Sequence, residues 1–326
     1  MNNYFKNEKW DKPITFAVKH KDIDVRMASR SGGVFTALTD YVLLSGGIVY
    51  GCVLDDSFSA IHIRATEAFT RDRMRGSKYI QSEMGDVYKK VKEDLDSEKY
   101  VLFSGTSCQV SGLIGFLGKS YENLLTIDIV CHGVPSPLVW KDYIYWQEEK
   151  NHSKVKSVEF RNKKDFGWKD HVESIVFENG KIINSRVFTT LFYEHSILRP
   201  SCYVCPYKDI IHPGNITLAD YWGIDNATPG FNDDKGVSLV LINDETGYSA
   251  FKKVSEMLDI RKTRIEDSMQ PPLETPCQKP ENRSEFWKND INKTFLLVEK
   301  NNKPTKGFYG KVKRKINKML KHILND

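Results

Sequence analysis

Strand-like and helix-like segments alternate along the first half of the chain, and this alternation limits the fold more than any other feature. Short apolar runs predict strands at 14–20, 47–54, 60–66, 99–105 and 124–133. Apolar residues at helical spacing predict helices at 32–45, 85–95, 108–118 and 137–150. Alternation of this kind is typical of an α/β fold. We therefore expect a mixed sheet flanked by helices.

The second half of the chain is richer in strands. Alternating apolar residues predict strands at 155–163, 171–188, 215–223 and 236–244. Asn179-Gly180 predicts a two-residue hairpin turn. Helices are expected at 246–258 and from Arg283 to about Val298, on either side of an extended, proline-rich connector at 269–280.

These patterns predict three parts of the chain. Residues 1–270 form one domain, with an α/β first half and a β-rich second half. Residues 271–302 form a proline-rich connector and a helix, and residues 303–326 form a basic amphipathic tail.

Composition and charge exclude several classes of protein. The chain has 326 residues, 40% of them hydrophobic and 28% charged, which is typical of a soluble globular protein. No apolar run reaches the roughly 18 residues of a membrane span, and the first residues lack the apolar core of a signal peptide. The net charge is +5, but residues 303–326 carry +7 and the rest −2, so the body is not expected to bind nucleic acid. We expect a cytoplasmic protein.

Four of the six cysteines stand at positions from which they could converge. Cys202 and Cys205 form a C-x-x-C pair between two prolines, in a loop. Cys108 directly follows one predicted strand and Cys131 ends the next. If these strands are parallel neighbours, their ends lie at one edge of the sheet, where α/β proteins bind ligands. The four thiols are therefore candidate metal ligands.

The residues alone leave the kind of site open. Four thiolates can bind a zinc ion or a [4Fe-4S] cluster, and buried cysteines also occur as plain apolar side chains. Cys52 lies inside a predicted strand and Cys277 in the connector, so neither is expected to join the site. His132 follows Cys131, and we expect it to make local hydrogen bonds without a catalytic role.

Two glycine-rich segments could bind phosphate groups. Ser31, Gly32 and Gly33 stand at the start of a predicted helix, where backbone N–H groups and the helix dipole favour an anion. The segment 75–79 places an arginine, a serine and a lysine around Gly76. Both segments lack a complete phosphate-binding motif, and the residues alone favour a serine N-cap followed by flexible glycines for the first of them.

Eight motifs, taken together and in order, resemble the beta-subunit family of coenzyme F420 hydrogenases and dehydrogenases. They run from about Ala28 to Asn243, and ENRSEFW near the end resembles a further family segment. The motifs are SGGVFTAL, GSKYIQS, FSGTSCQVSGL, IDIVCHGVPSP, FRNK with a nearby GW, RPSCYVC, NITLADYWGI and GVSLVLIN.

The resemblance implies a flavin- and iron-sulfur-dependent oxidoreductase. FAD is then held by Ser31, Gly32, Gly33, Gly76, Ser77, Lys78 and Tyr79. A [4Fe-4S] cluster is held by Cys108, Cys131, Cys202 and Cys205. Electrons would pass between an acceptor and an unidentified reduced donor, either a deazaflavin like coenzyme F420 or a ferredoxin. No residue is assigned to substrate proton transfer. Many family members carry an N-terminal ferredoxin-like module that this chain lacks, so an electron-donor protein or a reduced coenzyme is an expected partner.

Kinship also suggests a biological setting. Short bacterial members of the family are associated with surface-polysaccharide synthesis, which would make a glycan-pathway enzyme a partner. The tail at 303–326 has an apolar stripe among its lysines, so it either packs on the body or contacts the inner face of an anionic membrane. The alternative function is a non-redox accessory protein whose four cysteines hold a structural zinc and whose surface binds a pathway partner.

Overall fold

The computed structural model describes residues 10–301, and most strands of the sequence prediction pair in one large sheet. Its strands are β1 (Ile14–His20), β2 (Ile48–Leu54), β3 (Ala60–Ala65), β4 (Val101–Thr106), β5 (Leu124–Ile129), β9 (Ile216–Asp220), β10 (Ser238–Ile242) and β11 (Leu258–Thr263). Their order across the sheet is β11-β1-β10-β9-β5-β4-β2-β3.

Both parallel and antiparallel pairs occur in this sheet. β2, β4, β5 and β9 run parallel, while β10 is antiparallel to β9, and β1 is antiparallel to both β10 and β11. β3 pairs antiparallel with β2 at the other edge. The predicted fold class, an α/β fold with a mixed sheet flanked by helices, is confirmed.

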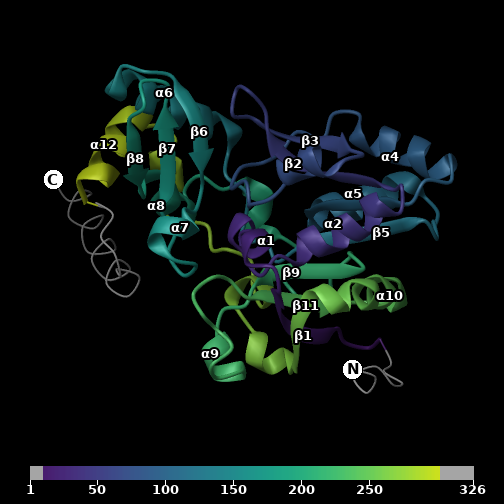
Figure 1. Ribbon diagram of the computed structural model, residues 1–326. Coiled ribbons are helices and arrows are strands. Elements are labelled where there is room, and N and C mark those ends of the chain that lie inside the picture. The colour runs from purple at the N-terminus through teal and green to yellow at the C-terminus, as the bar shows by residue number, and fades with distance from the viewer. Residues whose placement is uncertain (1–9, 302–326) are drawn as a thin grey trace.

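Helices cover both faces of the large sheet (Figure 1). On one face α2 (Val34–Leu44) and α10 (Glu245–Val254) pack against a core that includes Leu102 of β4. On the other, α4 (Val87–Asp96) and α5 (Ser107–Leu117) pack against Val101 and Phe103 of the same strand. Successive side chains of a strand point to opposite faces, so one continuous apolar run supplies both cores. Short helices α1 (Ile23–Ala28), α3 (Ala68–Asp72) and α9 (Ile224–Ala227) join these elements.

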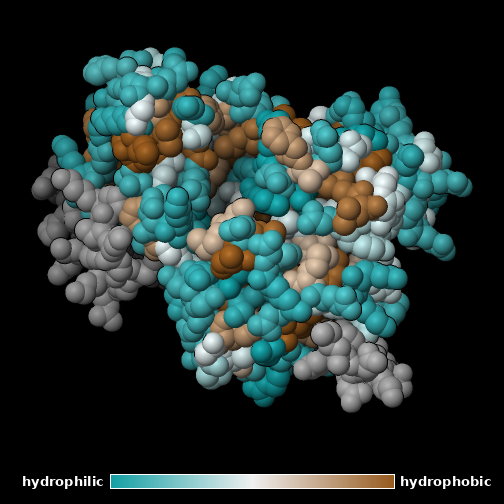
Figure 2. Space-filling model, viewed as in Figure 1, coloured by the Kyte–Doolittle hydropathy of each residue, from teal (hydrophilic) through white to brown (hydrophobic). Residues whose placement is uncertain are grey.

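A second unit is built around a small antiparallel sheet of β6 (Val155–Glu159), β7 (Glu173–Phe177) and β8 (Ile182–Ser185). It includes α6 (Pro137–Asn151), α7 (Lys163–Phe166), α8 (Val187–Tyr193) and α12 (Ile291–Asn301), and lies beside the large sheet (Figure 1). Its core is strongly aromatic, with Trp140, Tyr143, Phe188 and Phe295 in ring contact. Figure 2 shows hydrophobic surface gathered over this unit, where Ile182 of β8 is 63% exposed.

The hairpin between β7 and β8 differs from the prediction at both ends. Phe177 pairs with Lys181, so the loop has three residues and not two, and Gly180 ends it in the left-handed conformation (φ +82°). The strand expected to continue to Phe188 ends at Ser185. The chain turns into α8 because the Ser185 hydroxyl accepts the N–H of Val187, and the carboxylate of Glu173 accepts that of Phe188.

Other differences concern the last third of the chain. The helix expected from Arg283 to Val298 is two helices, α11 (Arg283–Phe286) and α12, because the side chain of Asp290 accepts the N–H of Asn292 and starts the second one. Strand β11 was not predicted. The connector contains a short 3-10 turn, Pro271–Leu273. No helix in residues 10–301 is long and apolar enough to cross a membrane. The predicted amphipathic tail at 303–326 lies outside the described residues.

Candidate functional site

Two of the four candidate cysteines lie at one edge of the large sheet. Cys108 is the second residue of α5, which follows β4 without a gap, and Cys131 lies two residues beyond the end of β5. β4 and β5 are parallel neighbours, with Thr106 opposite Ile129. The predicted strand pairing is therefore confirmed, and both cysteines lie at the carboxyl ends of adjacent parallel strands.

The C-x-x-C pair comes to the same place from a distant part of the chain. Cys202 lies in a 3-10 helix, Pro200–Val204, and Cys205 ends it. The N–H of Val134 donates to the Cys202 sulfur at 3.4 Å, and the carbonyl of Val134 accepts the N–H of Arg199 at 2.9 Å. These bonds fix the pair against the turn that follows Cys131.

The thiols interact electrostatically as one group. Burial raises the pKa of Cys131 to about 12, and the neighbouring sulfurs of Cys202 and Cys108 add to this rise. Burial also raises the pKa of Cys202, and Cys205 and Cys108 contribute to it in the same direction. Three segments far apart in sequence thus bring the four sulfurs close enough that the ionisation of one thiol raises the pKa of its neighbours.

Polar groups around the thiols favour the ionised form. Backbone N–H groups of Gly133 and Val134 lower the pKa values of Cys131 and Cys202 respectively. The buried ammonium of Lys208 donates to the carbonyls of Cys131 and His132. Its charge lowers the pKa values of the Cys131 and Cys202 thiols. Sequence reasoning missed Lys208, because a lysine three residues after a cysteine pair carries no recognisable signal.

The first glycine-rich segment is held tightly between strands. A Cβ on Gly32 would lie 2.1 Å from the carbonyl oxygen of Val18, so no other residue fits there without a backbone shift. The N–H of Gly32 donates to the Ser238 hydroxyl, and the Ser31 hydroxyl donates to the carbonyl of Val237. Gly33 then begins α2 with φ +91°. These contacts give the three residues a structural role at the amino end of α2.

The second glycine-rich segment lies next to the first. The Arg75 guanidinium donates from Nε to the Thr36 hydroxyl in the first turn of α2, at 3.2 Å. Lys78 donates to the carbonyls of Arg73 and Arg75, and burial lowers its pKa to about 8. Gly76 has φ +79° and open space where a Cβ would stand. The segment 75–78 therefore adds the Arg75 guanidinium beside the amino end of this helix, while the Lys78 ammonium binds carbonyls of its own segment.

Tyr79 points away from this helix, toward the second unit. Its ring contacts Phe160 and Phe192, and its hydroxyl accepts a hydrogen bond from Arg161. Phe192 in turn contacts the ring of His132, whose neighbour is Cys131. The N–H of Gln81 also donates to the carbonyl of Pro135. Ring contacts thus run without a break from the segment of Tyr79 to the cysteine turn.

A group of buried cations lies beside Tyr79, at the junction between the large sheet and the second unit. Arg161 donates to the Asp220 carboxylate at 2.5 Å and is 2% exposed at its side chain. Arg30 donates to the carbonyl of Arg161, and burial together with the Arg161 charge lowers the pKa of Arg30 to about 10. Burial also lowers the pKa of Lys163 to about 7. In this group the Asp220 carboxylate pairs with Arg161, and the charges of Asp220 and Glu159 act on Arg30.

These charged residues lie in motifs to which the sequence by itself assigns no role. Arg161 and Lys163 belong to the FRNK motif. Asp220 belongs to ADYW, whose residue types are compatible with a pocket or with the core. Trp222 stacks on the ring of Trp168 at 5.1 Å, and the indole N–H of Trp168 donates to Asp220. The signal that could have singled them out is the presence of charged residues inside otherwise apolar, strand-like segments.

The two remaining cysteines differ from each other. Cys52 is a partly buried residue of β2 whose thiol donates weakly to the carbonyl of Val53. Cys277 is buried, and its sulfur lies within 4.8 Å of ring nitrogens of His132 and His195. Burial raises the pKa of the Cys277 thiol, and Lys208 lowers it. The connector therefore brings Cys277 to the candidate site, which its position in the sequence did not predict.

Comparison with known proteins identifies the family. The family model for the C terminus of the coenzyme F420 hydrogenase/dehydrogenase beta subunit matches residues 98–268, which is more than half of the chain. The chain belongs to this family. The match includes all four candidate cysteines and the Arg161–Asp220 pair, and the resemblance stated from the motifs is confirmed. Membership makes the protein a redox subunit of the hydrogenase/dehydrogenase type.

The fold of this family member is similar to a solved structure. A chain of the F420-reducing [NiFe] hydrogenase complex from Methanosarcina barkeri, studied by xenon derivatization, superposes with a TM-score of 0.52. The two chains are 18% identical, and the superposition covers 91% of this chain and 94% of the other. At that identity the likeness is one of fold. No protein of curated function matches the chain.

Proposed function

We propose that the protein is an oxidoreductase subunit that binds FAD and one [4Fe-4S] cluster and transfers electrons between a reduced donor and an acceptor. Cys108, Cys131, Cys202 and Cys205 hold the cluster in this proposal. When bound, the two groups supply the chemistry, since a flavin accepts two electrons and a cluster passes them on singly. The chain's own residues bind these two groups, and the charges and hydrogen bonds around the site stabilise them.

The observation that carries the proposal is the convergence of the four thiols. They come from β4–α5, the turn after β5 and the 200–205 segment, and the pKa of Cys131 responds to both Cys108 and Cys202. Hydrogen bonds to sulfur and a nearby cation are the means by which proteins stabilise and tune such clusters. In this proposal the N–H groups of Gly133 and Val134 and the ammonium of Lys208, which lower the pKa values of the thiols, take these roles.

The separation of the thiols favours a cluster over a zinc ion. Zinc bonds thiolate at about 2.3 Å, so a tetrahedral four-thiolate site places its sulfurs roughly 3.8 Å apart. In residues 10–301, the set of three or more ligand groups found within 4.8 Å of one another is His132, His195 and Cys277, and it includes none of these four thiols. A cluster is larger than a single ion and separates its ligands further. The non-redox accessory function with a four-cysteine zinc therefore has less support.

The proposed flavin site lies around the two glycine-rich segments. The amino end of α2, the backbone around Gly76 and the side chains of Arg75 and Lys78 suit the pyrophosphate of FAD. In this proposal Ser31, Gly32 and Gly33 shape the helix start, and Ser77 and Lys78 contact the phosphates. Tyr79 bounds the ring end of the site, and its contacts through Phe192 lead toward Cys131.

A redox partner is part of the proposal. Cys108 is exposed, so the cysteine site is accessible from the surface. An electron-donor protein such as a ferredoxin, or a reduced coenzyme such as F420, could therefore exchange electrons there. The role in a surface-polysaccharide pathway and the membrane contact of residues 303–326 stay predictions.

The test is anaerobic analysis of iron, acid-labile sulfide and flavin in the wild type and in Cys202→Ser. We expect about four iron and four sulfide per wild-type chain, the content of one [4Fe-4S] cluster, together with releasable FAD. Cys202→Ser should lose most of its iron and keep its flavin, because the serine oxygen is a poor ligand for this cluster. Cys52→Ser is the matched control and should retain wild-type iron, since Cys52 lies in β2 outside the site.

Two results would reject the proposal. Iron that is unchanged in Cys202→Ser removes the C-x-x-C pair from the cluster. A colourless wild type that binds one zinc through four sulfurs supports the accessory function instead.

A further inference from the structure

Three metal-ligating side chains meet beside the proposed cluster without belonging to it. His132 follows β5, His195 follows α8, and Cys277 lies in the proline-rich connector. One ligand atom from each lies within 4.8 Å of the other two. Nε2 of His132 is 2.9 Å from Nε2 of His195, and the Cys277 sulfur is 2.7 Å from the carbonyl oxygen of His132. Two imidazoles and one thiol from three separate segments form a compact donor set.

The hydrogen bonds orient the two rings as a metal would need them. Nδ1 of His195 is 3.2 Å from the carbonyl oxygen of Gln278, and because a carbonyl only accepts, this nitrogen carries the proton. When the His195 ring is neutral with its proton on Nδ1, its Nε2 is the acceptor and the N–H of His132 donates to it. A backbone carbonyl that fixes one nitrogen of a histidine and directs the other inward is the usual outer partner of a metal ligand.

Little movement is needed to admit an ion. With zinc–nitrogen bonds of 2.0–2.1 Å, tetrahedral geometry places two ligating nitrogens roughly 3.3 Å apart. The observed 2.9 Å therefore has to open by only a few tenths of an ångström. The His132 proton moves from Nε2 to Nδ1 in the process, and the Cys277 thiol releases its proton to water.

The surroundings favour a soft, partly dehydrated ion. Cys277 is 9% exposed, and the His132 ring lies against Phe192 and Tyr193 at 5.0 and 5.2 Å. Burial, with the charges of His195 and Lys208, lowers the pKa of His132 to about 3, so this ring is neutral at physiological pH, as a ligand must be. Burial raises the pKa of Cys277 and the Lys208 charge opposes that rise, so the thiol is protonated without an ion and loses its proton when the ion binds.

We propose that His132, His195 and Cys277 bind one Zn²⁺ ion, with the fourth position open to water. Two imidazole nitrogens and one thiolate suit zinc better than magnesium or calcium, which prefer oxygen ligands. The ion links the connector to the turn that carries Cys131 and to the segment before the C-x-x-C pair. It is a site separate from the four-cysteine site, and it requires neither iron nor flavin.

The test uses the full-length protein purified under argon and titrated with Zn²⁺ alone. We expect one tightly bound zinc per chain after gel filtration, and X-ray absorption at the zinc edge should show one sulfur and two or three nitrogen or oxygen neighbours. Added zinc should raise the melting temperature of the wild type, because it binds the folded state. Cys277→Ala and His195→Gln should each bind zinc at least about tenfold more weakly, the lower end of losses seen for outer partners of a metal.

Each remaining outcome has a defined meaning. Cys52→Ala is the control and should bind zinc like the wild type. Iron content reports the four-cysteine site separately and should not change in Cys277→Ala. The proposal is overturned if wild type retains no zinc, if Cys277→Ala retains it fully, or if absorption shows four sulfurs around the ion. The absorption measurement needs only the wild type, so a variant that fails to fold does not obscure the result.

Discussion

Replacing Asp220 with asparagine tests whether the buried cation group at the junction of the two units depends on a single carboxylate. Asp220 accepts hydrogen bonds from Arg161 at 2.5 Å and from the Trp168 indole at 2.7 Å. Burial by itself would raise the pKa of Asp220, but the charges of Arg161 and Arg30 outweigh it and hold the pKa below its usual value. The carboxylate is therefore ionised at neutral pH.

The expected cost follows from burial. Arg161 is 2% exposed, so asparagine would leave its charge uncompensated beside Arg30. The asparagine N–H₂ would also face either the guanidinium or the indole N–H, both of which only donate. Breaking a buried ion pair in this way typically costs about 3–5 kcal/mol. We expect Asp220→Asn to lower the free energy of unfolding by that amount at pH 7.

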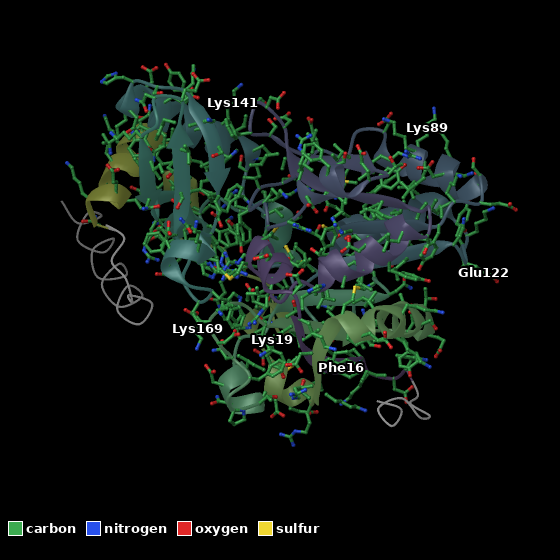
Figure 3. All side chains as sticks on the ribbon, in the orientation of Figure 1. Phe16, Lys19, Lys89, Glu122, Lys141 and Lys169 are labelled. Carbon is green, nitrogen blue, oxygen red and sulfur yellow. The ribbon has the colours of Figure 1, made fainter. Side chains whose placement is uncertain are left out.

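The assay is urea unfolding under argon, followed by circular dichroism, on samples matched for iron and flavin. Asp225→Asn is the control, because the Lys169–Asp225 pair is 55% and 56% exposed and such pairs contribute at most about 1 kcal/mol. Figure 3 shows Lys169 at the molecular surface. Adding Arg161→Met to Asp220→Asn should recover part of the loss, since it removes the unpaired charge.

The pH dependence gives a second check on the same reasoning. The folded-state pKa of Asp220 is depressed, so its contribution is fully present above the unfolded pKa of about 3.9 and is lost as the pH falls through the lower folded value. The gap between wild type and Asp220→Asn should narrow below about pH 4. A gap smaller than about 1 kcal/mol at pH 7 would show that Asp220 does not compensate Arg161 as described.

Further predictions concern packing and titration. Gly32→Ala should lower the free energy of unfolding by about 3 kcal/mol or more, because its Cβ would meet the Val18 carbonyl at 2.1 Å. Gly115→Ala, in α5 with no atom within 4 Å of its Cβ, should instead stabilise by about 0.5–1 kcal/mol, and equal effects of the two changes in urea would refute the steric argument. Burial lowers the pKa of His62 to about 4, so the unfolded chain takes up a proton first as the pH falls below 6.5. Wild type should lose about 2 kcal/mol between pH 7 and 5 through this group, and His62→Gln should lose less; parallel urea midpoints over that range would contradict it.

Much of the fold could be predicted from local patterns. β4 and β5 are continuous apolar runs buried on both faces, and their burial between two helical layers left few other arrangements. The differences arise where a single side chain far along the sequence decides the outcome. Glu173 accepts the N–H of Phe188 and starts α8 where alternation predicted a strand. β11 forms because β1 offers it an open edge, which its own sequence does not reveal.

The candidate site, like the fold, could be predicted from local sequence patterns only in part. The four cysteines could be chosen from spacing and from their places after strands, because parallel strands align their ends. Cys277 and His195 could not, since neither stands in a recognisable motif. They meet His132 only because the segment after α8 and the connector both pack beside the turn after β5. The cations Arg30, Arg161 and Lys163 could not be predicted either, because only the fold brings them close together in a buried place.

By itself, the sequence determined the alternation of elements, the α/β class, the family and which thiols stand at strand ends, because these depend on residue type and spacing along the chain. Tertiary structure alone decided which buried charges share Asp220, how Lys208 reaches the cysteine turn, and that two histidines and Cys277 converge. Electrostatic and coordinative interactions depend on distances in space, and these distances are set only when segments remote in the chain pack together.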